Sequence, residues 1–190
     1  MKRGMHLARA ALAAAAVLAG MGLTASNGLA AAGHHTTAAR ATLAAQTGDH
    51  RCYIGDLSAG LHPQQPRTQN YGFILTLTNV SSLPCSVDGY PGLGLQNARH
   101  RVLASHTFWG PTSFDRDPGR QVIVLSPGET ASGDVAWSQA PTAGTGVRAT
   151  YLEVTPPNDY THFVLRIPGG PYEIYHGNLH ATAMARHTPF

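Results

Sequence analysis

The fold of this chain is decided by residues 78–93, TNVSSLPCSVDGYPGL. They end a segment in which two sets of side chains alternate, Phe73, Leu75 and Leu77 against Ile74, Thr76 and Thr78. A polar turn, one of the two cysteines and a Gly-Tyr-Pro-Gly corner then follow. Alternation with a period of two, ended by turn residues, is typical of a half-buried β-strand. We therefore expect a β-protein.

Short runs of the same kind recur along the chain, separated by Gly, Pro, Asn and Asp. The candidate strands are 53–57, 71–78, 93–96, 101–108, 121–125, 130–137, 149–155, 162–167 and 172–175. Pro127 and Gly128 predict a tight turn, and we interpret Asn79–Ser81 as an Asx-type turn although it matches a glycosylation acceptor. No amphipathic helix of useful length follows Gly48. This spacing predicts an all-β fold, an immunoglobulin-like antiparallel β-sandwich of about 7–9 strands.

The N-terminus predicts export. Three basic residues precede a short apolar run at 10–23, and Ala30–Ala32 supplies small residues for cleavage. We interpret residues 1–32 as a signal peptide rather than a retained membrane helix, because a span needs about 20 apolar residues. Residues 33–48, rich in Ala and Thr and free of aromatic residues, predict a disordered linker. Residues 49–190 suit one domain, with no stable membrane insertion.

Removing the predicted signal also removes the net charge. The chain has 13 Lys and Arg against 10 Asp and Glu, and the excess is accounted for by Lys2, Arg3 and Arg9. Without a basic cluster, the counterion release that dominates nucleic-acid binding is weak. Nucleic acid is therefore not an expected partner.

The two cysteines, Cys52 and Cys85, predict a disulfide, because an exported protein meets an oxidising environment. Such a bridge would hold the N-terminal edge of the domain. Two buried thiols are the alternative.

Five segments, taken in order, resemble a known family: LTLTN at 75–79, PC at 84–85, GYPG at 89–92, LSPG at 125–128 and ATYLEVTPP at 149–157. The chain from Cys52 to Thr182 is similar to the secreted actinobacterial domain of unknown function 4232 (DUF4232) family. Members commonly carry a second cysteine pair, which this chain lacks around Val147 and around Gly170, so Cys52 and Cys85 are the natural remaining pair. The resemblance implies an all-β extracellular domain and carries no activity.

Motifs for catalysis and cofactor binding are absent from the sequence. It has no Gly-x-Ser-x-Gly elbow, no His-Glu-x-x-His, no paired Cys-x-x-Cys and no glycine-rich phosphate loop. His176 and His180 are four residues apart, but residues 172–183 predict a strand and a loop, where that spacing has no special meaning for metal binding. We therefore expect no cofactor, no metal site and no enzymatic activity. A carboxylate pair of the glycosidase kind stays open, because such pairing is spatial.

Residues 106–120, HTFWGPTSFDRDPGR, place aromatic and charged side chains in a predicted loop between strands. The candidate ligand or partner contacts are Phe108, Trp109, Phe114 and Arg116. Aromatics beside an arginine on a loop at the end of a sandwich form the kind of patch that binds partners. The alternative is that Trp109 and Phe114 fold inward as a plug over one end of the core, since large aromatics are buried on average.

Together these features predict a secreted, extracellular β-sandwich that is monomeric or weakly associating, free or associated with the cell wall. We expect a binding or structural module whose partner is an envelope component or protein. The alternative is a secreted hydrolase with an active site assembled from loops. An aromatic-lined pocket with two converging titratable groups would distinguish the hydrolase from the module.

Export is testable by processing. We expect the culture medium to contain a chain that begins near Gly33, because Ala30–Ala32 is the best cleavage site. Intact mass and N-terminal sequencing measure this directly. A chain that retains Met1 and stays in the membrane fraction would contradict the signal-peptide interpretation.

Overall fold

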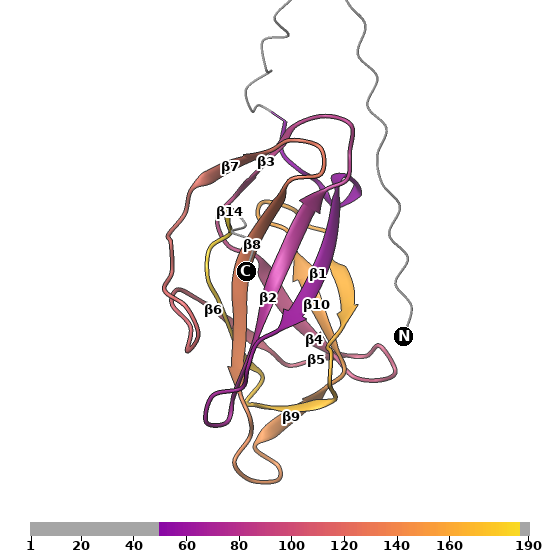
Figure 1. The fold of residues 1–190 in the computed structure, drawn as a ribbon. Coiled ribbons are helices and arrows are strands. Elements are labelled where there is room, and N and C mark those ends of the chain that lie inside the picture. The colour runs from indigo at the N-terminus through magenta and orange to yellow at the C-terminus, as the bar shows by residue number, and fades with distance from the viewer. Residues whose placement is uncertain (1–49, 187–190) are drawn as a thin grey trace, which may run out of the picture. The chain divides into compact units, whose positions relative to one another are not determined.

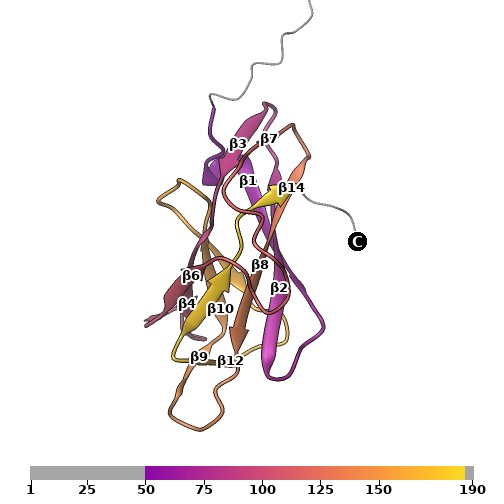
Figure 2. The same ribbon diagram turned by 90° about the vertical axis from the view of Figure 1, so that its left-hand side faces the viewer.

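A computed structural model of the chain describes residues 50–186, and Figures 1 and 2 show two layers of β-strands. The predicted signal peptide at 1–32 and the predicted linker at 33–48 lie outside the described residues. In the part that is described, no helix is long and apolar enough to cross a membrane. The all-β antiparallel sandwich is confirmed.

The first layer is a six-stranded sheet. Its path is β1 (Leu57–Pro63), β2 (Asn70–Asn79), β8 (Thr130–Ser138), β13 (Asn178–Ala181) and β6 (His106–Trp109), and β14 (Ala185–Arg186) also pairs with β8. Every neighbouring pair is antiparallel apart from β13 and β6, which run parallel. The strand β6 therefore forms one edge of this sheet.

The second layer is a four-stranded sheet, with two short strand pairs beside it. The sheet contains β11 (Phe163–Arg166), β10 (Tyr151–Thr155), β4 (Gly92–Gln96) and β5 (Val102–Leu103). The pairs are β3 (Cys85–Asp88) with β7 (Val122–Leu125), and β9 (Gly146–Ala149) with β12 (Tyr172–Tyr175). The pair β3–β7 lies at one end of the domain and β9–β12 at the other (Figures 1 and 2).

The core fills the space between the layers, because alternate residues of each strand point inward. On β2 the residues Phe73, Leu75 and Leu77 are buried while the intervening ones are partly exposed, which confirms the predicted alternation. Trp137 of β8 stacks on Phe73 with ring centroids 5.0 Å apart. Leu95 and Leu152 enter from the opposite sheet. Burial of this apolar area is the main favourable term in folding.

The structure corrects several predicted strands. Residues 53–57 form the 3-10 helix η1 (Ile54–Asp56) instead of a strand, because the Asp56 carboxylate accepts a bond from the Tyr53 amide and closes a local turn. The predicted runs 101–108 and 149–155 are each divided between two strands. Strands β1, β3, β13 and β14 were not predicted at all. The described residues therefore contain fourteen strands instead of seven to nine.

One of these missed strands changes the setting of two histidines. His176 has a φ of 50° and Gly177 a φ of 69°, and these left-handed residues turn the chain from β12 directly into β13. His180 therefore lies on a strand where a loop was predicted. β13 has only four residues, so its alternation of polar and apolar side chains is too short to predict a strand from the sequence.

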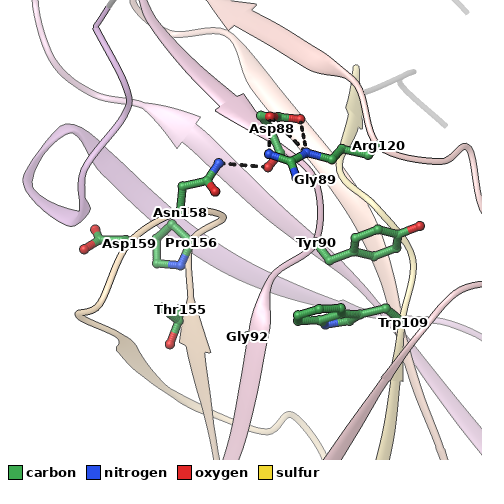
Figure 3. A pocket seen from close by; sticks show the side chains of 10 residues that line it. All are labelled: Asp88, Gly89, Tyr90, Gly92, Trp109, Arg120, Thr155, Pro156, Asn158 and Asp159. Atoms are coloured by element: carbon green, nitrogen blue, oxygen red, sulfur yellow. Dashed lines mark hydrogen bonds and ion pairs between the residues drawn. The ribbon is translucent and has the colours of Figure 1, made fainter.

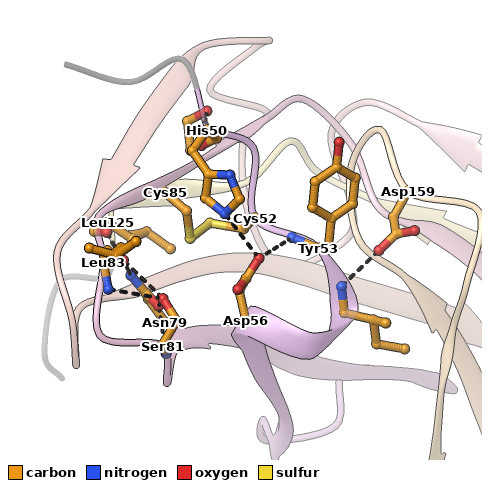
Figure 4. Close-up of polar contacts among 12 residues, drawn as sticks. His50, Cys52, Tyr53, Asp56, Asn79, Ser81, Leu83, Cys85, Leu125 and Asp159 are labelled. Carbon is orange, nitrogen blue, oxygen red and sulfur yellow. Dashed lines mark hydrogen bonds and ion pairs between the residues drawn. A yellow bond between two sulfur atoms is a disulfide. The ribbon is translucent and has the colours of Figure 1, made fainter. Parts of the chain in front are cut away.

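The predicted disulfide between Cys52 and Cys85 is present. Cys52 precedes η1 and Cys85 is the first residue of β3, so the bridge joins the start of the domain to its β3–β7 end (Figure 4). Two backbone hydrogen bonds flank it, from Cys52 N to Ser86 O and from Ser86 N to His50 O, both 2.9 Å. Closing this loop stabilises the fold mainly by restricting the unfolded chain.

Next to the disulfide, the buried side-chain amide of Asn79 connects three segments (Figure 4). Its Nδ2 donates to Leu83 O at 2.8 Å and to Leu125 O at 2.9 Å. Its Oδ1 accepts from the Ser81 amide at 2.9 Å, which confirms the predicted Asx turn. The side chain is 0% exposed, so it is a structural group in the folded domain.

We expect Asn79→Ala to lower the free energy of unfolding by roughly 2–4 kcal/mol, because two buried carbonyl oxygens lose their donor. Chemical denaturation of the purified domain measures this. Ser81→Ala is the matched control in the same turn, and we expect it to cost about 1 kcal/mol, since its hydroxyl bonds lie nearer the solvent. Equal losses in the two variants would contradict the role assigned to the Asn79 amide.

Candidate functional site

A pocket of about 280 Å³ lies where the edge strand β6 of the first sheet meets β4 and β10 of the second (Figure 3). It is lined by Asp88, Gly89, Tyr90, Gly92, Trp109, Arg120, Thr155, Pro156, Asn158 and Asp159. These residues come from the corner between β3 and β4, the end of β6, the loop before β7 and the turn after β10. Thr107 of β6 donates to Leu93 O of β4 at 3.0 Å and holds the two layers together here.

Tyr90 and Trp109 form the aromatic wall of the pocket. Their rings stack with centroids 5.6 Å apart and an interplanar angle of 19°. Trp109 Nε1 donates to Pro91 O at 3.1 Å, so the indole has a fixed orientation. The side chain nevertheless remains 62% exposed. A large aromatic that is both exposed and held in place is unusual, because large aromatics are buried on average.

Asp117 fixes Tyr90 from behind. The Tyr90 hydroxyl donates to Asp117 Oδ2 at 2.5 Å, and the Ala183 amide donates to Asp117 Oδ1 at 2.9 Å. Burial would raise the pKa of Asp117, but these bonds and one from the Gly119 amide outweigh it and hold the pKa below its usual value. The bond to Asp117, together with burial, raises the pKa of Tyr90. Tyr90 is therefore a neutral hydrogen-bond donor to Asp117 at neutral pH.

An ion pair lines the pocket above the aromatic wall. Arg120 Nε lies 3.0 Å from Asp88 Oδ1, and its Nη2 lies 2.7 Å from Oδ2, which makes the pair bidentate. The hydrogen bond from Arg120 lowers the pKa of Asp88. Asn158 Nδ2 donates to the Asp88 backbone carbonyl at 3.1 Å, which ties the turn after β10 to the end of β3. The pair is an electrically neutral polar group.

Asp159 organises the turn after β10. Its Oδ2 accepts from the Ile54 amide at 2.8 Å, and its Oδ1 accepts from the amides of Tyr160 and Thr161 and from the Thr161 hydroxyl. Burial would raise the pKa of Asp159, but the backbone amides dominate and lower it. The carboxylate is therefore ionised at neutral pH and is fully engaged within the protein.

The pocket combines aromatic and polar groups. The pocket offers an aromatic surface, hydrogen-bond donors and acceptors, and carboxylates that are already bonded. Within residues 50–186, no group of three or more His, Cys, Asp or Glu side chains is placed to hold a metal ion. Ligand pockets generally combine apolar and aromatic lining with a few positioned polar groups, as this one does.

Of the four residues singled out in the sequence, only Trp109 lines this pocket. Phe108, its neighbour on β6, stacks on His180 with centroids 5.3 Å apart and is 49% exposed. Adjacent strand residues point to opposite faces, so Phe108 and Trp109 belong to different surfaces. The interpretation of Trp109 as a core plug is wrong, because its side chain is mostly exposed.

Phe114 and Arg116 lie elsewhere on the same connection. Phe114 is half-buried on the outer face of β2, where a Cβ on Gly72 would meet its ring at 2.6 Å. The Arg67 guanidinium lies 5.2 Å from the centre of the same ring. Arg116 is exposed, and its amide donates to Asp115 Oδ1 at 2.7 Å. The predicted patch is thus dispersed over separate surfaces.

Sequence reasoning missed most of the pocket. Tyr90 lies in the Gly-Tyr-Pro-Gly corner, which predicts only a turn, and Asn158 and Asp159 follow the segment 149–157, which carries the family resemblance but predicts no site. The corner at 89–92 and the turn at 156–159 both contain Pro, Gly or Asn and lie next to strand ends. Binding residues concentrate in such turns. That shared character was the available signal, although it could not show that the two turns face each other.

The family model described as "Domain of unknown function (DUF4232)" matches residues 52–185. The matched span includes every residue that lines the pocket. No curated protein and no solved structure matches the chain significantly.

A second cleft, of about 170 Å³, contains the acidic side chain Asp134 of β8. This residue is only 5% exposed. Gln64 Nε2 and Thr112 Oγ1 both donate to its carboxylate, so it connects β8 to the β1–β2 loop and to the connection after β6. Burial raises the pKa of Asp134 and the repulsion from Asp115 adds to it, while the two hydrogen bonds and Arg67 act in the opposite direction without offsetting it.

We therefore expect the contribution of Asp134 to the free energy of unfolding to fall as pH rises. A carboxyl whose pKa is higher in the folded than in the unfolded state binds more protons when folded. The free energy of unfolding then falls from about pH 4, the unfolded pKa, until the folded pKa is passed. Asp134→Asn removes this titration, because an amide does not ionise. The new side chain can keep both hydrogen bonds once Gln64 reverses its own amide.

The measurement is denaturation of parent and variant across this range of pH. We expect the stability of Asp134→Asn relative to the parent to increase as pH rises. The other shifted carboxyls, Asp88, Asp117, Glu129 and Asp159, are common to both proteins and cancel in the difference. A difference that is constant with pH would show that the pKa of Asp134 is not raised.

Proposed function

The chain belongs to the DUF4232 family, and from this premise we propose that it is an exported binding module of the cell envelope that uses the pocket at Trp109. The family description assigns no activity. The role of this domain must therefore be argued from its own site.

The observation that carries the proposal is the state of Trp109. Its indole is 62% exposed, yet it is held by the stack on Tyr90 and by the bond to Pro91. An aromatic side chain fixed before binding loses little conformational freedom when a ligand arrives. Aromatic anchors of this kind dominate the energetics of many interfaces.

Export is supported by two features of the chain. The N-terminal 32 residues carry the charge, apolar run and small residues of a signal peptide. The disulfide between Cys52 and Cys85 is typical of proteins in oxidising compartments. The envelope is the first structure that such a protein meets, so we propose a partner there.

We propose a binding rather than a hydrolytic role. A glycosidase needs one protonated and one ionised carboxyl that flank the substrate. In the Trp109 pocket, Asp88 and Asp159 both have a lowered pKa, so neither supplies a proton at neutral pH. In the second cleft, Asp134 has a raised pKa, but its carboxylate accepts bonds from Gln64 and Thr112 and is turned away from solvent.

The test compares the two tryptophans of the chain. We expect Trp109→Ala to abolish capture of the domain by the cell-envelope fraction of the producing organism. Its free energy of unfolding should fall by about 1 kcal/mol, the value of one aromatic stack. Trp137→Ala should instead cost about 3–5 kcal/mol, because this side chain is 1% exposed in the core.

The matched control is Phe108→Ala. It removes an exposed aromatic from the same strand but from the opposite face, so capture should persist. Co-sedimentation with the envelope fraction and thermal melting provide the two readouts. Undiminished capture of a folded Trp109→Ala protein would overturn the proposal.

A further inference from the structure

The charges of the Trp109 pocket are already balanced within the protein. Asp88 is neutralised by the bidentate contact with Arg120, and the carboxylate of Asp159 accepts three backbone amides and one hydroxyl. A strongly charged ligand would have to displace one of these arrangements or leave its own charge unpaired, and both are costly. Charge complementarity therefore favours a neutral ligand.

The polar groups that remain are a mixture of donors and acceptors. Arg120 Nη1 takes no part in the bond to Asp88 and can donate, while Asn158 Oδ1 and the remaining lone pairs of Asp88 can accept. Thr155 adds a hydroxyl that does both. A ligand with hydroxyl groups matches this set, because each hydroxyl both donates and accepts. The prolines of a proline-rich peptide match it less well, since each presents a carbonyl acceptor without an N–H donor.

The aromatic wall supplies the apolar half of the site. Tyr90 covers one face of the Trp109 indole, and the side chain is still largely exposed, so the opposite face is open. The face of an aromatic ring carries negative potential and attracts groups with partial positive charge. The axial C–H groups of a sugar ring have this polarity and form a flat surface of similar size.

The dimensions of the pocket agree with a ligand of this kind. Its volume, about 280 Å³, is just below the range for drug-sized small-molecule sites, which begins at about 300 Å³. Figure 3 shows the aromatic pair on one side of the pocket and Thr155, Pro156 and Asn158 on the other. Tyr90 lies between the open face of Trp109 and the Asp88–Arg120 pair, so two neighbouring rings of one saccharide reach both.

From these observations we infer that the ligand of the pocket is a neutral saccharide. One sugar ring packs on the open face of Trp109, and the hydroxyls of a neighbouring ring bond to the Asp88–Arg120 pair and to Asn158. The inference rests on the proposed function, because it names the class of envelope component that the module binds.

The test is affinity electrophoresis against a panel of polysaccharides. Dextran, mannan, galactan and arabinan are the neutral members, and polygalacturonate and chitosan are the charged ones. We expect at least one neutral member to retard the domain, with little change at about 1 M salt, where the Debye length is roughly 3 Å. Binding should also shift the tryptophan emission, since Trp109 is the exposed one of the two tryptophans.

Variants connect binding to this pocket. Trp109→Ala should weaken retardation about tenfold or more, as expected for an aromatic anchor. Asp88→Ala should weaken it as well, and by leaving Arg120 unpaired should create binding to polygalacturonate that salt removes. Phe108→Ala should bind like the parent, because it leaves the pocket intact.

Two failures are distinguishable. If no neutral polysaccharide binds, or only a charged one binds and salt abolishes it, the saccharide inference is overturned. If in that case Trp109→Ala still loses envelope capture, the proposed function survives with a different ligand. If a neutral polysaccharide binds equally to the parent and to Trp109→Ala, the assignment to this pocket is wrong.

Discussion

The structure depends on the way the buried amide of Asn79 ends β2. This side chain bonds to the carbonyls of Leu83 and Leu125 and to the amide of Ser81, and so closes the turn that carries the chain out of the first sheet. Buried polar groups are generally hydrogen-bonded, and in this turn both the nitrogen and the oxygen of the Asn79 amide have partners. That geometry delivers Cys85 to its partner Cys52 and sets the direction of β3.

The position of β3 in turn places the Trp109 pocket. Asp88 is the last residue of β3, and the corner at 89–92 leads directly into β4 of the second sheet. The opposing surfaces arrive from distant segments, Trp109 on β6 and Asn158 after β10. The pocket is therefore a product of the sandwich, because it exists only where an edge strand of one sheet meets strands of the other.

The polar groups of this region show a consistent arrangement. Each carboxylate in or behind the pocket, Asp88, Asp117 and Asp159, is held by donors of the protein and has a lowered pKa. Fixed groups of this kind orient a ligand without large rearrangement, which is the usual source of specificity in small sites. Asp134 differs, since it is bonded by neutral donors in a more buried place and its pKa is raised.

Several features could be predicted from the sequence because they depend on local patterns. The alternation at 73–78 predicted a strand with Phe73, Leu75 and Leu77 inward, and the Asx turn and the turn at Pro127–Gly128 followed from residue chemistry. The two cysteines predicted their own bridge, because no other partner existed. The family resemblance over most of the domain also came from these segments.

Other features depend on contacts between segments that are far apart in the chain. The strands β1, β3 and β13 form because neighbours supply their hydrogen bonds, since β3 and β13 have only four residues each and β1 contains Gly60 and Pro63. The exposure of Trp109 follows from its place on an edge strand with Tyr90 beside it, and composition alone had suggested burial. The sequence by itself determined the β class, the main strand and the disulfide, since each rests on nearby residues or on a single possible pairing. Only the tertiary structure decided which side chains share a pocket, because that depends on how the two sheets bring together residues from β3, β6 and β10.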